Sequence, residues 1–354
     1  MFEVSSAETS EQTNQDRNML SRFDTASSHS ATATATPAPS ASTPASAQSG
    51  GGVKLKSPEE LRAHLAASLK ERCAVLAASF AEGSPDAITL IDMIAQPAEH
   101  VIRRAPIAAQ RSLKLARNEN SSMSQLAQLI SGDPTLAQAL LRLANSAEYA
   151  TGGSHCTSIS DAIRRVGARG VESVVLRCMV EGLFCRPGGA YQAMSDLIWA
   201  HMVRCAPIGR AMGRLFSTNQ DEAFLLAMMH DVGKLVLFDR IVNLRTVLRR
   251  DPKFPAPFVG AVLRLVHEPL GGLAALEWGL GEKAAGAIAS HHRREIFEFS
   301  DLTSQLLFAT ERADLALSCG GPADIDGWIN AGGLTTTAQL IQGALDNIPS
   351  EKSN

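Results

Sequence analysis

The amino-acid sequence predicts an all-α fold, and three observations support this prediction. Alanine and leucine are abundant, while aromatic residues make up only 5% of the 354 residues. This composition favours helices, because aromatic and β-branched side chains prefer strands. Apolar residues recur at helical spacing, as at Leu136, Leu140 and Leu143. No segment shows the convincing alternation of apolar and polar residues that is typical of a half-buried strand.

Residues 1–55 are expected to form a disordered leader. The stretch 27–52 consists almost entirely of Ser, Ala, Thr, Pro and Gly. It carries too few large apolar side chains to offset the entropy lost when a chain becomes ordered. The leader either tethers the following domain to a partner or is a dispensable tail, and its composition does not choose between these two roles.

Helix-start signals mark the elements that follow. Ser57-Pro58-Glu59-Glu60 places Ser at the N-cap, Pro at the first helical position and Glu at the third, where the Ser and Glu side chains satisfy free backbone N–H groups. Similar signals occur at Ser84-Pro85 and Asp133-Pro134. A helix from about Ser160 should stop near Gly167, and another should run from about Val171 to Phe184. Later helices are predicted at Trp199–Leu215, Glu222–Phe238, Pro257–Trp278, Glu282–His291, Leu302–Cys319 and Thr335–Asn347.

These segments predict a main domain with additions at both ends. N-terminal helices should occupy residues 56–98. The main domain should cover residues 99–320, with Pro187-Gly188-Gly189 separating an N-terminal helical part (99–187) from a second part (190–320). Residues 321–354 should form a tail with one short helix.

Charge and cysteine content point to a cytoplasmic protein that does not insert into membranes. The formal net charge of -3 gives no general attraction to nucleic acid or to an anionic membrane. No apolar run approaches the roughly 18–20 residues that span a bilayer. The six cysteines are scattered without a C-x-x-C pair, as expected of reduced cytosolic thiols. Neither a phosphate-binding glycine loop nor a G-x-S-x-G elbow is present, which argues against those enzyme classes.

Two stretches resemble the HDOD family, regulatory relatives of the HD and HD-GYP metal phosphohydrolases. Residues 129–147 read LISGDPTLAQALLRLANSA and are followed by TSISDAI at residues 157–163. Residues 224–235 read FLLAMMHDVGKL, similar to the helix that gives HD proteins their name. The resemblance covers roughly residues 100–320. It implies an HD-like helical bundle with an N-terminal helical subdomain, in a family that is mostly regulatory and in which many members are thought to lack hydrolase activity.

The second half of the chain gathers five of its nine histidines, namely His201, His230, His267, His291 and His292. Imidazole and carboxylate groups together suit a first-row divalent metal. Asp231 is expected on an apolar helix face, where a carboxylate is costly unless it is paired or binds metal. Lys234 follows closely and is a candidate for contacting a phosphate. Taken singly, however, a buried histidine is more often a hydrogen-bonded core residue than a ligand.

The resemblance implies a set of metal ligands. His201, His230 and Asp231 match the first three ligand places of HD enzymes, and Asp314 is the best match for the fourth. His267 and one of His291 or His292 resemble the additional ligands of two-metal relatives, so the implied ion is iron, manganese or zinc. One departure from the HD-GYP pattern is clear. The sequence after the double histidine is RREIF and no Gly-Tyr-Pro occurs, which argues against cyclic dinucleotide hydrolysis.

Two functions remain from the sequence. The first is a regulatory signal-transduction module without strong catalysis, which would bind a kinase, a cyclic-dinucleotide enzyme or a nucleotide. The second is a metal-dependent phosphohydrolase in which Lys234 contacts the substrate phosphate. Basic residues without interleaved aromatics make nucleic-acid binding a weaker interpretation. Assembly into a homo-oligomer is left open.

Overall fold

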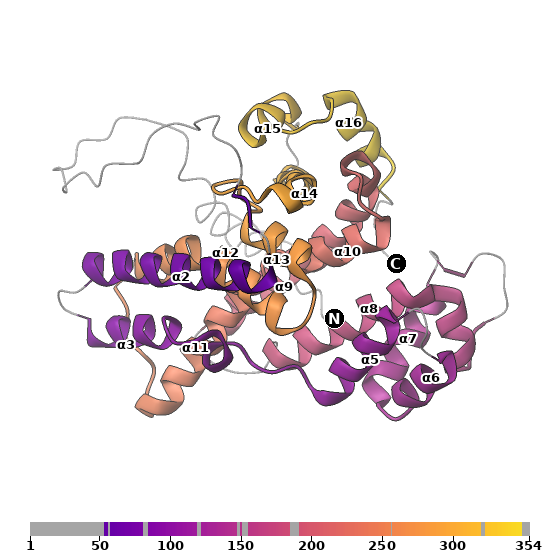
Figure 1. Ribbon diagram of the computed structural model, residues 1–354, viewed down its shortest axis with the longest axis horizontal. Coiled ribbons are helices and arrows are strands. Elements are labelled where there is room, and N and C mark those ends of the chain that lie inside the picture. Colours follow the sequence, from indigo (N-terminus) through magenta and orange to yellow (C-terminus); the bar gives the residue numbers. More distant parts are fainter. Residues whose placement is uncertain are drawn as a thin grey trace, which may run out of the picture.

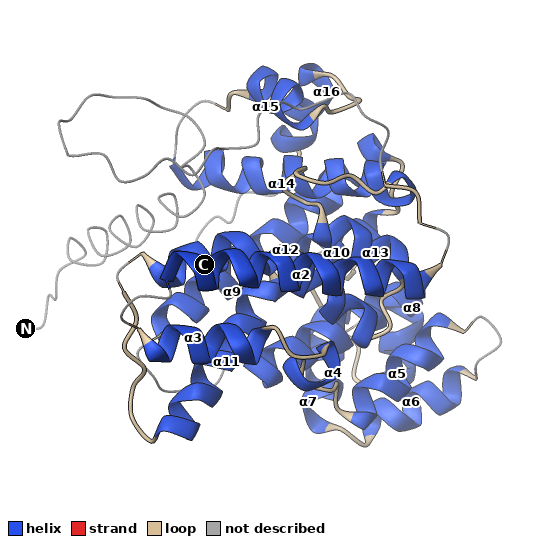
Figure 2. Ribbon diagram, turned by 60° about the vertical axis from the view of Figure 1, so that its left-hand side comes forward, coloured by secondary structure: helices blue, strands red, loops and turns tan. Residues whose placement is uncertain are grey.

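The computed structural model describes residues 53–55, 57–80, 84–118, 122–146, 149–150, 155–184, 191–255, 257–319 and 323–348. Within these ranges the chain is a set of packed helices, and the one bridge of β type joins Val53 to Phe297 (Figures 1 and 2). The all-α prediction is therefore confirmed. Most of the predicted leader and the Pro187-Gly188-Gly189 segment lie outside the described residues.

The predicted helix starts at Ser57, Ser84 and Asp133 are confirmed. Each of these side chains accepts a hydrogen bond from the backbone N–H three residues later, at 3.2, 3.4 and 3.2 Å. This bond satisfies one of the free donors of a helix N-terminus. The helices that begin there are α2 (Pro58–Phe80), α3 (Pro85–Ile94) and α7 (Pro134–Ala144).

The N-terminal helical part is built around the long helix α8 (Ile159–Phe184). Its backbone leaves helical geometry at Gly167, where φ is +71°, so the predicted stop near this glycine is confirmed. Helices α5, α6 and α7 pack against α8 on one side of the molecule (Figure 1). The remaining bounds in this part are α4 (Ala98–Val101), α5 (Ile107–Arg117) and α6 (Met123–Ser131).

Helix α12 (Phe258–Glu277) lies at the centre of the second part and packs against α2, α11 and α13. Among the described helices it is the one long and apolar enough to cross a membrane, so the expectation that no apolar run approaches this length is wrong. Most of its apolar stretch is buried within the protein. The other elements are α9 (Gln192–Met212), η1 (Gly213–Phe216), α10 (Gln220–Met229), α11 (Val232–Leu248), α13 (Glu282–Ala289), η2 (Glu298–Ser300) and α14 (Asp301–Cys319).

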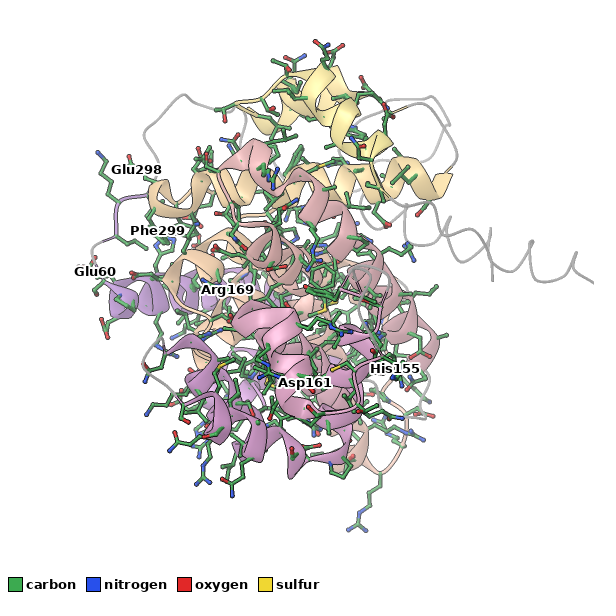
Figure 3. The ribbon with its side chains drawn as sticks, turned by 90° about the vertical axis from the view of Figure 1, so that its right-hand side faces the viewer. Glu60, His155, Asp161, Arg169, Glu298 and Phe299 are labelled. Carbon is green, nitrogen blue, oxygen red and sulfur yellow. The ribbon has the colours of Figure 1, made fainter. Side chains whose placement is uncertain are left out.

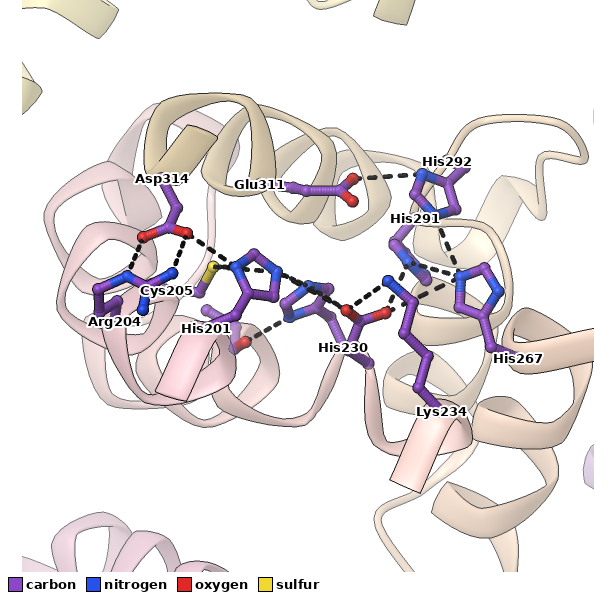
Figure 4. A network of polar contacts seen from close by, with 12 residues as sticks. His201, Arg204, Cys205, His230, Lys234, His267, His291, His292, Glu311 and Asp314 are labelled. Carbon is purple, nitrogen blue, oxygen red and sulfur yellow. Dashed lines mark hydrogen bonds and ion pairs between the residues drawn. The ribbon is translucent and has the colours of Figure 1, made fainter. Parts of the chain in front are cut away.

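The single helix predicted at Glu222–Phe238 is wrong, because the structure contains two helices there. Helix α10 ends at Met229 and α11 begins at Val232, with Asp231 between them at φ −100° and ψ 11°. Successive residues of a continuous helix point about 100° apart around the axis. The break removes that constraint and allows two adjacent side chains, His230 and Asp231, to reach the same buried cluster (Figure 4).

Both ends of the described chain pack on the second part. Helix α2 lies along α12, and the short 3₁₀ helix carrying Glu298 and Phe299 lies at the same edge of the molecule as Glu60 (Figures 1 and 3). Beyond α14, helices α15 (Ile325–Gly332) and α16 (Ala338–Asp346) form a cap. A helix was expected at the position of α16, whereas α15 was not predicted.

Candidate metal centre

Four helices deliver the histidines to one buried cluster (Figure 4). His201 lies on α9, His230 at the end of α10, and His267 in the middle of α12. His291 and His292 directly follow α13. The side chains of His230, His267 and His291 are at most 2% exposed, while those of His201 and His292 are 15% and 12% exposed at the edges of the cluster.

The protonation of the three deepest histidines is set by the backbone. Atom Nδ1 of His230, His267 and His291 lies 2.7, 2.6 and 2.7 Å from a backbone carbonyl oxygen of its own turn. A carbonyl only accepts, so each Nδ1 carries the proton and donates it, and Nε2 of the neutral ring keeps a free lone pair. Burial lowers the pKa of all three rings, well below the usual value for His267 and His291.

Several Nε2 atoms of the cluster lie close to one another, and in one pair a hydrogen bond does not explain the distance. The Nε2 atoms of His267 and His291 are 3.3 Å apart, yet both are acceptors. The Nε2 atoms of His267 and His292 are 3.0 Å apart, and those of His201 and His230 are 3.2 Å apart. Two imidazole ligands at about 2.0–2.1 Å from one ion would lie about 2.9–3.4 Å apart. The donor set therefore fits divalent metal.

Asp231 lies between two groups of histidines. Its Oδ2 is 3.7 Å from Nε2 of His201 and 3.6 Å from Nε2 of His230. Its Oδ1 is 3.9 Å from Nε2 of His267 and 3.7 Å from Nε2 of His291. We call the side of His201, His230 and Oδ2 the first position. We call the side of His267, His291, His292 and Oδ1 the second position.

The Asp231 carboxylate is fully buried and ionised. Neither oxygen accepts a hydrogen bond of good geometry, and its closest charged neighbour is Nζ of Lys234, 2.7 Å from Oδ2. Burial by itself raises the pKa of this carboxyl. Lys234 and then the neighbouring histidines lower it by more, so the net pKa lies well below the usual value. A buried anion with so few hydrogen bonds is a good bridging ligand for cations.

The structure places Asp314 behind His201 rather than at the Nε2 atoms. Its Oδ2 lies 2.8 Å from Nδ1 of His201, and both carboxylate oxygens accept hydrogen bonds from Arg204, at 2.9 and 3.0 Å. Its geometry is thus that of a partner that orients His201, and direct metal binding by Asp314 stays a prediction. Burial raises the pKa of Asp314, and the hydrogen bonds from His201 and Arg204 lower it by more.

Glu311 was not predicted as a site residue, yet it faces the cluster from one turn earlier on α14. Its Oε2 is 3.2 Å from Nδ1 of His292, and the carboxylate is 8% exposed. Burial raises the pKa of Glu311, but His292 lowers it by more, so the net pKa is well below the usual value. The only signal in the sequence is its i, i+3 spacing from Asp314, which places both acids on one helix face.

Cys205 also lies in the cluster, one turn after His201. Its Sγ is 3.7 Å from Nδ1 and 3.8 Å from Nε2 of His201. A thiolate that shared an ion with Nε2 would lie much closer to Nε2 than to Nδ1. The nearly equal distances therefore place the thiol beside the ring, where it packs against His201 without joining the first position.

Comparison with known proteins identifies the fold and the family. A family model of the HDOD domain matches residues 102–294, which is more than half of the chain. A curated relative, an uncharacterized protein of Treponema pallidum (strain Nichols), is 24% identical over 205 residues. This match covers 54% of the present chain and 38% of that relative, so the chain spans well under half of the relative's length.

Three solved structures share the fold at 18–20% sequence identity. A candidate phosphohydrolase from Shewanella amazonensis SB2B has a TM-score of 0.53, with 75% of this chain and 93% of that chain covered. An HDOD domain protein with unknown function from Geobacter sulfurreducens has a TM-score of 0.50, with 69% and 89% covered. A candidate signal transduction protein from Marinobacter aquaeolei VT8 has a TM-score of 0.55, with 81% and 65% covered. With the family match and the motifs at residues 129–147 and 224–235, these similarities show that the chain belongs to the HDOD domain family.

Proposed function

We propose that this HDOD protein binds a pair of divalent metal ions and hydrolyses a phosphoester in signal transduction. The observation that supports the proposal most directly is the pair of Nε2 atoms of His267 and His291, 3.3 Å apart, on two rings that each carry their proton on Nδ1. Nothing else among the described residues explains two acceptors at this distance in a buried site, and a shared cation does.

The two positions would hold one ion each, with Asp231 shared between them. His201 and His230 complete the first position, and His267, His291 and His292 complete the second. Such a pair supplies the Lewis-acid chemistry that suits phosphoester hydrolysis. The neutral rings of His230, His267 and His291 and the ionised carboxylate of Asp231 suit iron, manganese or zinc, although the donor types do not choose among these metals.

In this proposal Lys234 meets the substrate phosphate. Its Nζ lies 2.7 Å from Asp231 and its side chain is 12% exposed, so it stands at the border between the buried carboxylate and solvent. An ammonium group there would contact a phosphate oxygen as a point charge. Burial and then Lys234 lower the pKa of the deep histidine His267, which keeps that ring neutral and able to bind metal.

A second candidate function is a regulatory module in which the ions serve structure alone. The burial of the donors favours it, because the most exposed histidine of the cluster, His201, shows only 15% of its side chain. In this case the domain would act by binding a signalling protein in the cytoplasm, such as a kinase or a cyclic-dinucleotide enzyme.

The first test is the metal content of protein purified without chelator, measured by mass spectrometry. Wild type is expected to hold metal at near-stoichiometric amounts and Asp231→Ala to lose it. Asp239→Asn is the matched control, since Asp239 is a buried carboxylate on α11 that pairs with Arg103 and Arg240 away from the cluster. Metal-free wild type, or an Asp231→Ala protein with full metal content, would refute the site.

Hydrolysis of bis(p-nitrophenyl) phosphate by the metal-loaded protein separates the two candidate functions. Turnover that is lost in Lys234→Ala while metal is retained supports the hydrolase. A protein that holds metal and does not cleave this probe or a panel of natural phosphodiesters supports the regulatory module instead.

A further inference from the structure

Glu268 lies next to His267 on α12 and holds the backbone of the double histidine. Its side chain is 1% exposed, and Oε1 accepts a hydrogen bond from the backbone N–H of His292 at 3.1 Å. His292 in turn lies with its Nε2 3.0 Å from Nε2 of His267. One carboxylate therefore ties together the two segments that form the second position.

Two arginines compensate the buried charge of Glu268. Nη1 of Arg72, on α2, and Nη1 of Arg294 each lie 3.5 Å from Oε2. Both guanidinium groups are held in place by backbone carbonyls, Arg72 by Leu265 and Arg294 by Arg264, at 2.8 Å each. A carboxylate buried to this extent is costly without such partners, so the conformation of Glu268 depends on α2.

Helix α2 also contacts the segment that continues from the double histidine. His64 on α2 lies 2.7 Å from Glu295, and its ring meets Phe297 edge-on at 5.6 Å. Just before α2, the backbone N–H of Val53 donates to the carbonyl of Ile296 at 2.8 Å. The segment that follows His292 is therefore held by α2 and by the residues just before it, although both lie outside residues 102–294 that match the family.

We propose that Glu268, supported by Arg72, is a positioning residue for the second position, and that α2 is consequently a working part of the metal centre. The inference rests on the proposed metal pair. Partners that orient metal ligands commonly change metal affinity by about 10–100-fold when they are removed. The same range is expected here, confined to the ion at the second position.

The test is a titration of metal-free protein with cobalt(II), followed by its visible absorption, with stoichiometry measured by mass spectrometry. Wild type should bind two ions. Glu268→Ala should weaken one of them about 10–100-fold and leave the other unchanged. Glu268→Gln keeps an acceptor for the His292 N–H and should recover most of the affinity. Arg72→Gln should weaken the same ion to a smaller degree.

Arg62→Gln is the matched control. Arg62 forms an ion pair with Glu277, and this pair also joins α2 to α12 but lies away from the cluster. If Arg62→Gln and Arg72→Gln bind cobalt with the same affinity, α2 has only a structural role at its contact with α12. This result would overturn the inference. If Glu268→Gln binds the ion at the second position as weakly as Glu268→Ala does, Glu268 is not a positioning residue.

The outcomes also distinguish this inference from the function on which it rests. If wild type takes up no cobalt, the proposed metal pair fails and the inference fails with it. If wild type and a folded Glu268→Ala protein both bind two ions equally well, the inference alone fails. If circular dichroism shows that Glu268→Ala does not fold, the cobalt affinities of Arg72→Gln and Arg62→Gln are compared instead. Equal affinities would then refute the inference.

Discussion

Gly233 determines how closely α11 approaches α12 beside the metal centre. A Cβ atom added to Gly233 would lie 2.0 Å from the backbone oxygen of His267 and 2.8 Å from the backbone nitrogen of Gly271. Both neighbours are backbone atoms of the central helix, so they cannot move aside as a flexible side chain would. Any larger residue must push α11, and Asp231 at its start, away from His267.

Gly233→Ala is therefore expected to lower the free energy of unfolding by about 1–3 kcal/mol or more and to reduce metal content. Urea unfolding and mass spectrometry measure the two effects. Gly343→Ala is the control, because nothing lies within 4 Å of a Cβ at this position in α16. It should be neutral or stabilise by about 0.5–1 kcal/mol. A Gly233→Ala protein with wild-type stability and metal would contradict the close packing described here.

Asp314 and Glu311 are expected to serve different metal positions. Asp314 holds Nδ1 of His201, so Asp314→Ala should weaken the ion at the first position about 10–100-fold. Glu311 faces Nδ1 of His292 at 3.2 Å, so Glu311→Ala should weaken the ion at the second position instead. Cobalt titration of each variant, with His201→Ala and His267→Ala marking the two positions, tests this separation. Loss of the same ion in both variants would contradict it.

The sequence could predict which histidines lie together, but not which of the two acidic residues of α14 faces each of them. The order of His201, His230-Asp231, His267 and His291-His292 is enough to indicate one cluster, and the structure brings all of these residues together. Glu311 and Asp314 share a helix face, so their roles depend on the rotation of α14 about its axis. That rotation is set by Phe308 and Ala313, which pack into an apolar cluster formed by distant segments.

At the level of elements, local signals predicted helix starts and missed breaks that arise from tertiary contacts. Capping residues and prolines identify α2, α3 and α7, because a cap acts on its own turn. The break between α10 and α11 has no proline and no glycine at Met229, His230 or Asp231. It follows from packing α11 against α12 and from the shared cluster, which no local pattern reveals.

Helix α3 is anchored by a carboxylate whose pKa gives a testable dependence on pH. Asp86 accepts hydrogen bonds from Arg250, at 2.7 and 2.8 Å, and from the backbone N–H of Lys253 at 2.7 Å. These bonds lower the pKa of Asp86 below its usual value. A group with a lower pKa in the folded state adds stability above its unfolded pKa of about 3.9, and this stability is lost as the pH falls through the folded value.

Asp86→Asn is therefore expected to lower the Tm by several degrees at pH 7, since the charge-assisted bonds to Arg250 and Lys253 are lost. The difference in Tm between wild type and variant should shrink as the pH falls below about 4. Thermal unfolding by circular dichroism from pH 7 to pH 3 measures this trend. A difference that stayed constant over this range would show that the ionised carboxylate does not stabilise α3.

On the scale of the whole molecule, two apolar clusters meet at α14. Leu307 belongs to the large cluster that extends from α2 to α13. Phe308, Ala309 and Ala313 belong to a smaller cluster with Trp328 and Ile341 of α15 and α16. The metal centre takes residues from both sides, because α14 contributes Glu311 and Asp314 while Asp231 and the histidines lie on elements of the large cluster or at its border. The cap therefore supports one wall of the site.

The smaller cluster is expected to open before the large one, because it buries fewer apolar side chains and a local opening costs less than global unfolding. Hydrogen exchange followed by mass spectrometry should show the amides of α15 and α16 exchanging well before those of α12. Trp328→Ala should speed exchange in α16 and in the second half of α14, while the amides of α12 stay protected. Uniform exchange of all three helices would contradict two clusters of unequal stability. Because Glu311 and Asp314 depend on α14, the same variant should also weaken cobalt binding at both positions, whereas Glu268→Ala affects the second position alone.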